Sequence, residues 1–166
     1  MSNLGRLQNK HNTLVFKDDD YETDATILKD LIPYLPAGRI YDPFYCNGLV
    51  KEEWKKLGRD NVLNEKKDAF EKIDSELFDM IISNIPFSIK KKCIDLCMSY
   101  DKPFILLMPI DTMGSLWFKE YFDKFQFIIP RKRYSFYKKG SKTNSSWFDT
   151  CWFCYKMNLP RDILKL

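Results

Sequence analysis

Several residue types and patterns are scarce in this sequence of 166 residues. His11 is its only histidine, which argues against hydrolases and other enzymes that depend on a catalytic histidine or a triad. No apolar run approaches the roughly 20 residues of a membrane span, and residues 1–12 lack the apolar stretch of a signal peptide. We therefore expect an intracellular protein, in the cytoplasm or nucleus, that does not associate with membranes.

The cysteines do not form an obvious disulfide or zinc pattern. Their number, five, is odd, which suits a reduced, intracellular protein. Cys151 and Cys154 have CxxC spacing, but they fall in a run of strand formers, where alternation directs them to opposite faces. Cys93 and Cys97 share one side of a predicted helix. The sequence therefore predicts Cys93 and Cys97 in the core and no metal site.

The composition is that of one folded domain. Hydrophobic residues make up 45% of the chain and charged residues 30%, a balance typical of a globular protein with a core. The length matches one ordinary domain. We expect residues 1–166 to form a single domain, in which residues 1–12, including His11, are flexible and inert.

Helix-like and strand-like segments alternate along the chain. Apolar residues at helical spacing predict helices over 23–35, 49–57, 89–100 and 114–122, and a weaker one over 67–73. Apolar, β-branched stretches predict strands over 39–41, 61–63, 78–83 and 104–108. Two longer strand-like runs, 125–137 and 147–157, follow each other without a helix. This order predicts an α/β domain with a mostly parallel sheet, helices on both faces and an antiparallel C-terminal hairpin.

Two segments with unusual polar residues each follow a predicted buried strand. They are Asp42-Pro43-Phe44-Tyr45-Cys46-Asn47-Gly48 and Ser83-Asn84-Ile85-Pro86-Phe87-Ser88. Ligands of such sheets bind outside the carboxyl ends of the strands. A buried Asp or Asn at a strand end needs hydrogen-bond partners, which a ligand can supply. The sequence therefore predicts a binding site built from these two segments.

The same segments carry a resemblance to a known family. The first resembles the Asp-Pro-Phe-x-Gly-x-Gly variant of the cofactor loop in amino-methyltransferases, and the second resembles their Asn-Pro-Pro-Phe catalytic loop. Both occur in the family's order, and the likeness extends over residues 13–157. The chain thus resembles the S-adenosylmethionine-dependent adenine-amino (N6-adenine) nucleic-acid methyltransferases. This resemblance implies a Rossmann-like class I methyltransferase fold, S-adenosylmethionine as cofactor, and methyl transfer to the exocyclic amine of adenine in DNA or RNA.

The resemblance also implies a set of cofactor-binding residues. They are Tyr21, Thr23, Asp42, Phe44, Gly48, Asn64, Glu65, Asp68 and Phe70. Asp42 can accept hydrogen bonds from the methionine ammonium, and Gly48 lets the backbone approach the cofactor closely. Glu65, or Asn64 if the strand ends earlier, can accept the ribose hydroxyls. Asp68 is placed to bind the adenine amine of the cofactor, and the ring of Phe70 to stack on it.

The catalytic residues implied by the second loop are Asn84, Ile85, Pro86 and Phe87. An exocyclic amine is a poor nucleophile, because its lone pair is delocalised into the ring. The Asn84 side-chain oxygen and the Ile85 carbonyl can accept its protons and free the lone pair, while Pro86 stiffens the loop. Phe87 can stack on the extruded base. Ile85 departs from the DNA enzymes, which have proline there, and resembles the ribosomal-RNA adenine dimethyltransferases. The cofactor loop favours DNA.

A basic, aromatic segment lies near the C-terminus. No acidic residue occurs between Lys124 and Asp149, and such a patch suits phosphates and stacked bases. The predicted nucleic-acid contacts are Arg131, Lys132, Arg133, Lys138, Lys139 and Lys142. Recognition of a particular sequence comes from this segment or from a protein partner, or is weak.

Two alternatives remain. The glycine-poor cofactor loop and Ile85 also fit a catalytically inactive methyltransferase-fold subunit that binds nucleic acid or a catalytic partner. A similar Asn-Pro-Pro-Tyr loop occurs in enzymes that methylate protein glutamine, but the basic segment argues against that substrate.

Overall fold

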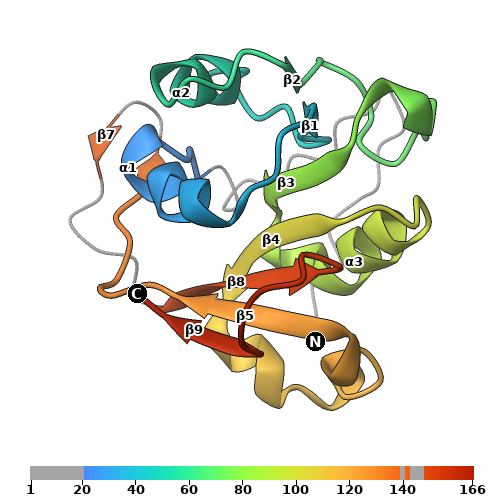
Figure 1. Cartoon of the computed structure of the whole chain (residues 1–166), viewed down its shortest axis with the longest axis vertical. Helices are drawn as coiled ribbons and strands as arrows, with labels where there is room; N and C mark the ends of the chain where they lie inside the picture. Colours follow the sequence, from blue (N-terminus) through green and yellow to red (C-terminus); the bar gives the residue numbers. More distant parts are fainter. Residues whose placement is uncertain (1–20, 139–140, 143–147) are drawn as a thin grey trace, which may run out of the picture.

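A seven-stranded sheet in the order β2-β1-β3-β4-β8-β5-β9 forms the middle of the molecule (Figure 1). The computed structural model describes residues 21–138, 141, 142 and 148–166. The strands of the sheet are β1 (Ile40–Tyr41), β2 (Val62–Leu63), β3 (Met80–Asn84), β4 (Phe104–Pro109), β5 (Phe125–Ile129), β8 (Thr150–Tyr155) and β9 (Ile163–Lys165). Strand β8 is antiparallel to both of its neighbours, β4 and β5, while the other pairs are parallel. The six parallel strands therefore end at the same edge of the sheet.

Helices cover both faces of this sheet. The α-helices are α1 (Ala25–Leu28), α2 (Val50–Lys56) and α3 (Lys90–Met98). Short 3-10 turns supplement them: η1 (Lys29–Tyr34), η2 (Ser75–Leu77), η3 (Phe87–Ile89), η4 (Ile110–Gly114), η5 (Leu116–Phe118) and η6 (Phe122–Lys124). The side chains of α1 and α2 pack on one face, and those of α3 and η5 pack on the other.

Alternation along the strands divides the core between these two faces. In β4, Phe104 and Leu106 join the layer under α3, while Ile105 and Leu107 join the layer under α1 and α2. All four side chains are fully buried, as expected for a central strand covered on both sides. This packing confirms the predicted α/β fold with a mostly parallel sheet, which is compatible with a Rossmann-like architecture.

The predicted C-terminal hairpin is confirmed in its pairing and corrected in its extent. Strands β5 and β8 pair antiparallel, but β5 ends at Ile129, before Pro130, rather than at residue 137. Between them lies a separate two-stranded ribbon of β6 (Tyr137–Lys138) and β7 (Ser141–Lys142). Strand β9, which the sequence did not predict, pairs parallel with β5.

Several predicted helices are shorter than expected. The helix predicted over 23–35 is α-helical only in α1 and continues as the 3-10 turn η1, which contains Pro33. A proline has no backbone N–H to continue the helix. Asp24 caps α1, because its side chain accepts hydrogen bonds from the backbone N–H groups of Thr26 and Ile27. The helix predicted over 114–122 is wrong, since η4, η5 and neighbouring turns occupy that stretch, and residues 67–73 contain no helix.

The cysteine predictions agree with this arrangement. Cys151 and Cys154 are buried on opposite faces of β8, and Cys93 and Cys97 lie in the layer under α3. In the described part of the chain, no helix combines the length and the apolar character needed to span a membrane. His11 and the N-terminal segment expected to be flexible lie outside the described residues.

Candidate functional site

The two polar loops meet because their strands are neighbours. Strand β1 pairs parallel with β3, with Tyr41 opposite Ile81, so the chain leaves both strands at the same edge. The Ser83 hydroxyl donates a hydrogen bond of 2.7 Å to Asp42 Oδ1, which also accepts one of 3.0 Å from the Phe44 backbone N–H. The structure thus brings the predicted cofactor loop and the predicted catalytic loop into direct contact.

The carboxyl group of Asp42 is unusual in its burial. Asp42 is 5% exposed, and removal from water raises its pKa from the ordinary 3.8 to about 7. The hydrogen bonds from Ser83 and from the Phe44 backbone oppose this rise only in part. Burial of an ionisable group without a neutralising cation is costly. A carboxyl group held in this way is therefore suited to a cationic ligand, which would favour its ionised form.

Asn84, at the end of β3, uses only the NH₂ group of its side-chain amide in a hydrogen bond within the described residues. Its Nδ2 donates a hydrogen bond of 3.1 Å to the Tyr21 backbone carbonyl. Its Oδ1 is buried and has no hydrogen-bond partner among the residues that the structure describes. Buried polar atoms are rarely left unpaired, so this oxygen is a preformed acceptor for a ligand. The hydrogen bond to Tyr21 determines which way the amide points.

The residues after Asn84 hold the loop in place. Ile85 is 2% exposed and packs into the layer under α3. Pro86 precedes the turn η3, and its carbonyl accepts a hydrogen bond of 3.3 Å from the Ile89 N–H. An apolar anchor and a fixed proline φ together restrict the loop. The acceptors at positions 84 and 85 therefore sit on a rigid support.

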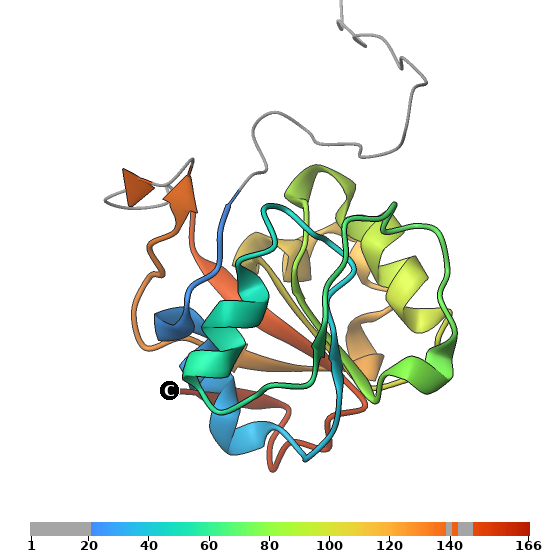
Figure 2. The same ribbon diagram turned by 90° about the horizontal axis from the view of Figure 1, so that it is seen from above.

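Four aromatic rings gather next to this loop. Tyr21 lies 6.3 Å from Phe87, with an angle of 23° between the two ring planes, and 5.6 Å from Phe136. Phe148 lies 5.3 Å from Phe87 and 6.0 Å from Tyr21. Phe136 and Phe148 flank the segment that contains β6 and β7, which rises beside the first described residues (Figure 2). The aromatic cluster of Tyr21, Phe87, Phe136 and Phe148 thus joins the catalytic loop to the base of the basic ribbon.

Asn64 and Glu65, the two candidates for the ribose site, have different surroundings. Asn64 is 2% exposed, and its Nδ2 donates to the carbonyls of Asp42 (3.0 Å) and Phe44 (3.3 Å). Its Oδ1 is another buried acceptor without a partner within the described ranges. Glu65 is exposed and forms an ion pair of 2.6 Å with Lys67, which lowers its pKa. Asn64 therefore braces the cofactor loop, while Glu65 offers a carboxylate at the rim.

Phe44, Asp68 and Phe70 line the side of the site beyond β2. The rings of Phe44 and Phe70 lie 6.1 Å apart in an edge-to-face arrangement. Asp68 Oδ1 accepts a hydrogen bond of 3.0 Å from the Phe70 N–H and so stabilises the turn that presents this ring. The Lys92 ammonium lies 3.8 Å from the centroid of the Phe70 ring. These contacts bring together two of the aromatic residues that the resemblance assigns to the cofactor site.

Gly48 adopts a conformation that favours glycine. Its φ is +78°, and a Cβ at this position would lie 2.6 Å from the Tyr45 hydroxyl. The loop also contains Cys46 with a positive φ of 50°. The Tyr45 ring therefore fills the space through which a ligand was expected to approach the backbone of Gly48. This ring has to move if a ligand is to contact that backbone.

Thr23 lies at a different hollow. It lines a cavity of ≈ 520 Å³ between the start of α1 and helix α2, together with Leu49 and Glu53. Leu49 directly follows Gly48, so this cavity adjoins the predicted cofactor loop. Thr23 and Tyr21 are thus on two sides of the site, with Tyr21 at the catalytic loop.

The predicted nucleic-acid contacts separate into two groups. Arg131, Lys132 and Arg133 are exposed in the turn that follows β5. Arg133 forms an ion pair of 2.8 Å with Asp149, which neutralises part of the patch. Lys138 and Lys142 belong to the ribbon β6–β7, and Lys139 lies outside the described residues.

Several residues of this candidate site were not assigned a role from the sequence. Ser83, which holds Asp42, could have been singled out as a polar residue at the end of an apolar strand. Phe148 gave no signal, because its contact with Phe87 spans 61 positions. Tyr45 stood inside the quoted cofactor loop without an assigned role.

Two comparisons with known proteins yielded no assignment. The chain matches no model of a known protein family, and it matches no curated protein sequence. The interpretation of the site therefore depends on its residues and their geometry.

Proposed function

We propose that this protein transfers a methyl group from S-adenosylmethionine to the exocyclic amine of adenine in DNA, with RNA as the less favoured substrate. One observation carries the proposal: Asn84 Oδ1, at the carboxyl end of β3, is buried and has no hydrogen-bond partner within the described part of the chain. An amine that donates a proton to this oxygen would satisfy it. The same hydrogen bond would direct the nitrogen lone pair away from the ring and toward an electrophile.

The chain's own residues account for the steps around the amine. Asn84 is oriented by Tyr21 before the substrate arrives, so its acceptor costs no reorganisation during the reaction. Phe87 offers a ring on which an extruded base can stack, and Tyr21 lies almost parallel to that ring. The Ile85 carbonyl would accept the second hydrogen bond from the target amine.

The cofactor loop supports the identity of the methyl donor. S-adenosylmethionine, when bound, supplies an electrophilic methyl group on a sulfonium and also carries a cationic ammonium. Asp42 is a buried carboxyl group whose pKa is raised to about 7, and a nearby cation would stabilise its ionised form. Oδ1 of Asn64, which has no partner among the described residues, and the rings of Phe44 and Phe70 suit the hydroxyls and the adenine of the same ligand.

The topology supports a class I methyltransferase fold. The resemblance implies a mostly parallel sheet with an antiparallel C-terminal hairpin, and β8 inserted between β4 and β5 is such an arrangement. The exposed Arg131 and Lys132 at the same edge suit a polyanionic substrate.

The test is incubation with labelled S-adenosylmethionine and a panel of DNA, RNA and protein substrates. We expect label in the N6 amine of adenine in DNA, with RNA labelled less. Asn84→Ala should abolish labelling while binding of the cofactor, followed by calorimetry, stays nearly unchanged. Labelling of protein glutamine, or full activity of Asn84→Ala, would contradict the proposal.

A second candidate function is that of an inactive subunit with the same fold. The observation that favours it is the Tyr45 ring, which fills the space next to Gly48. If the unmutated protein binds nucleic acid but shows no binding of S-adenosylmethionine in calorimetry, this second function replaces the first.

A further inference from the structure

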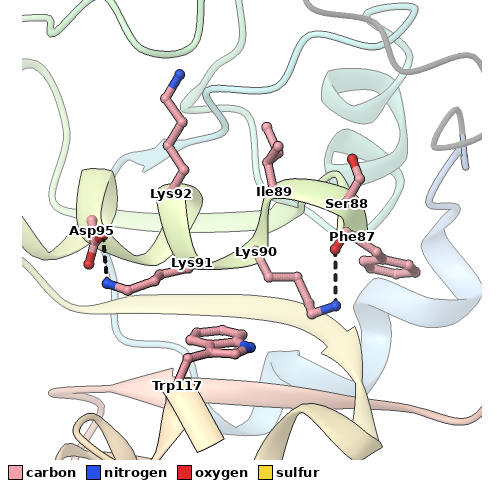
Figure 3. A pocket seen from close by; sticks show the side chains of 8 residues that line it. All are labelled: Phe87, Ser88, Ile89, Lys90, Lys91, Lys92, Asp95 and Trp117. Atoms are coloured by element: carbon pink, nitrogen blue, oxygen red, sulfur yellow. Dashed lines mark hydrogen bonds and ion pairs between the residues drawn. The ribbon is translucent and has the colours of Figure 1, made fainter. Parts of the chain in front are cut away.

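A cavity of ≈ 630 Å³ lies between the first turn of α3 and the turn η5 (Figure 3). It begins at Phe87 in the catalytic loop and extends along Ser88–Lys92 to Asp95, with Trp117 on the opposite wall. It lies outside the contact between Asp42 and Ser83 and outside the aromatic cluster, except for the shared Phe87. This volume falls within the ≈ 300–1,000 Å³ of small-molecule sites.

The three consecutive lysines of this wall have different surroundings. Lys91 is committed to its neighbours: its ammonium lies 2.6 Å from the Tyr121 hydroxyl and 3.2 Å from Asp95 Oδ2, contacts that raise its pKa. Lys92 turns toward the Phe70 ring instead. Of the three described lysines on this wall, only Lys90 keeps its ammonium available to the cavity.

Lys90 is half-buried and holds the catalytic loop. Its ammonium donates one hydrogen bond of 3.0 Å to the Phe87 carbonyl, and among the described residues no carboxylate forms an ion pair with it. An ammonium has three donors, so Lys90 can bind an anion while it keeps the bond to Phe87. Such an anion would sit directly beside the loop that carries Asn84.

Trp117 supplies the apolar wall opposite the lysines (Figure 3). It is half-buried and packs edge-to-face against Phe118 at 5.7 Å and Tyr121 at 6.2 Å. These contacts hold the indole in place. Proteins that bind single-stranded nucleic acid combine an aromatic ring, on which a base stacks, with a cation that contacts a phosphate. An indole held opposite a lysine offers both.

We propose that this cavity binds a nucleotide that neighbours the target base, with its base against Trp117 and its phosphate on Lys90. The inference rests on the proposed function, because it places the nucleotide next to a base held by Phe87 and Asn84. It adds a second anchoring point, away from the basic turn after β5. Enzymes that act on an extruded base also contact the nucleotides that flank it, and this cavity would provide one such contact.

The experiment measures binding of a short single-stranded DNA by fluorescence anisotropy across a range of salt concentrations. Trp117→Leu should weaken binding by about fivefold to a hundredfold, the range for loss of one stacked base, and Trp117→Phe should restore much of it. Lys90→Met should flatten the salt dependence by about 0.7 in log–log slope, the value for one phosphate contact on a single strand. Lys90→Arg should retain that slope. Lys55→Met, on exposed α2, is the matched control and should change neither quantity.

A measurement without a substitution in the cavity covers the case in which Trp117→Leu fails to fold. Trp54 and Trp152 are fully buried, so in a Trp147→Phe background the oligonucleotide should quench the fluorescence of Trp117. Absence of quenching, or unchanged affinity and salt slope in the folded variants, would overturn the proposal. Quenching by polyglutamate but not by DNA would also overturn it, in favour of an acidic peptide.

The two proposals fail separately. If the protein methylates adenine and the cavity variants bind DNA normally, only the inference about Trp117 and Lys90 is wrong. If DNA quenches Trp117 but no methyl transfer occurs, the cavity binds a nucleotide and the proposed reaction is wrong.

Discussion

Replacement of Asp42 by asparagine is expected to stabilise the fold at pH 8 and to weaken the site. The carboxyl group is buried, and its pKa rises from 3.8 to about 7. The folded state therefore holds the proton more tightly than the unfolded state. The stability that this carboxyl group contributes is fully present below pH 3.8, falls as pH rises toward 7, and is lost above the folded pKa.

The size of this effect follows from the two pKa values. With 1.36 kcal/mol per pKa unit, the raised pKa of Asp42 destabilises the fold, relative to the fully protonated group, by about 4 kcal/mol at pH 8 and by about 2 kcal/mol at pH 5. Asparagine can still accept the hydrogen bonds from Ser83 and from the Phe44 backbone. An unsatisfied amide N–H would cost about 1–3 kcal/mol, but equally at both pH values. The difference in unfolding free energy between the variant and the unmutated protein should therefore grow by about 2 kcal/mol from pH 5 to pH 8.

Urea unfolding at the two pH values measures this difference without knowledge of the ligand. With a slope of about 2 kcal/mol/M, the gap between the two midpoints should widen by roughly 1 M at pH 8. Ser83→Ala, which leaves the carboxyl group in place, serves as the control and should retain the pH dependence. A gap that is the same at pH 5 and pH 8 would refute the argument that burial makes this carboxyl group responsive to a cation.

The site should show the opposite trend. A cationic ligand binds the ionised form of Asp42, so affinity for S-adenosylmethionine should be about tenfold lower at pH 6 than at pH 8. In Asp42→Asn this pH dependence should disappear, and affinity at pH 8 should fall by about tenfold or more, because a charged hydrogen bond contributes about 1.5–3 kcal/mol. Calorimetry in buffers of different ionisation enthalpy should also detect protons released on binding near pH 7.

The remaining predictions concern the two loops and the basic turn. Asn84→Ala should lower kcat by about 10²–10³-fold, as for loss of one preorganised polar group, with little change in cofactor affinity by calorimetry; equal losses in both would point to a structural role. Gly48→Ala should weaken cofactor binding, because its φ is +78° and the new Cβ would meet Tyr45. Adding Tyr45→Ala should remove the contact with the new Cβ but not the backbone strain at a positive φ. Neutralising Arg131 and Lys132 together should flatten the salt dependence of DNA binding by up to ~2 in log–log slope. Neutralising Arg133 as well should add less, because it is already paired with Asp149. Unchanged affinity at every salt concentration would show that the basic turn does not contact DNA.

Local patterns in the sequence determined most of the strands and the positions of the two loops. The apolar, β-branched runs before Asn84 and after Pro103 are long enough to predict β3 and β4, because a buried strand needs little more than apolar side chains on both faces. A polar residue directly after such a run marks the ligand edge of a parallel sheet. Asp42 and Asn84 were therefore predictable as candidate site residues before any contact was known.

Other features depended on contacts between distant parts of the chain. The insertion of β8 between β4 and β5 follows from packing across the whole sheet, which no local pattern encodes. The 3-10 turns at 110–124 replaced a predicted helix, since apolar spacing there reflects burial of Phe118 against β5 and β8 rather than helical periodicity. Propensity is a weak guide where tertiary contacts decide.

The chemistry of the site was decided by tertiary structure in the same way. The sequence shows that Asp42 and Ser83 exist, but their hydrogen bond, and the burial that raises the pKa of Asp42, arise only when β1 and β3 pair. Likewise, Trp117 faces Lys90 only because η5 packs beside α3. A pKa and a cavity are properties of surroundings, so residue types along a chain nominate the participants, and the fold determines what they can do.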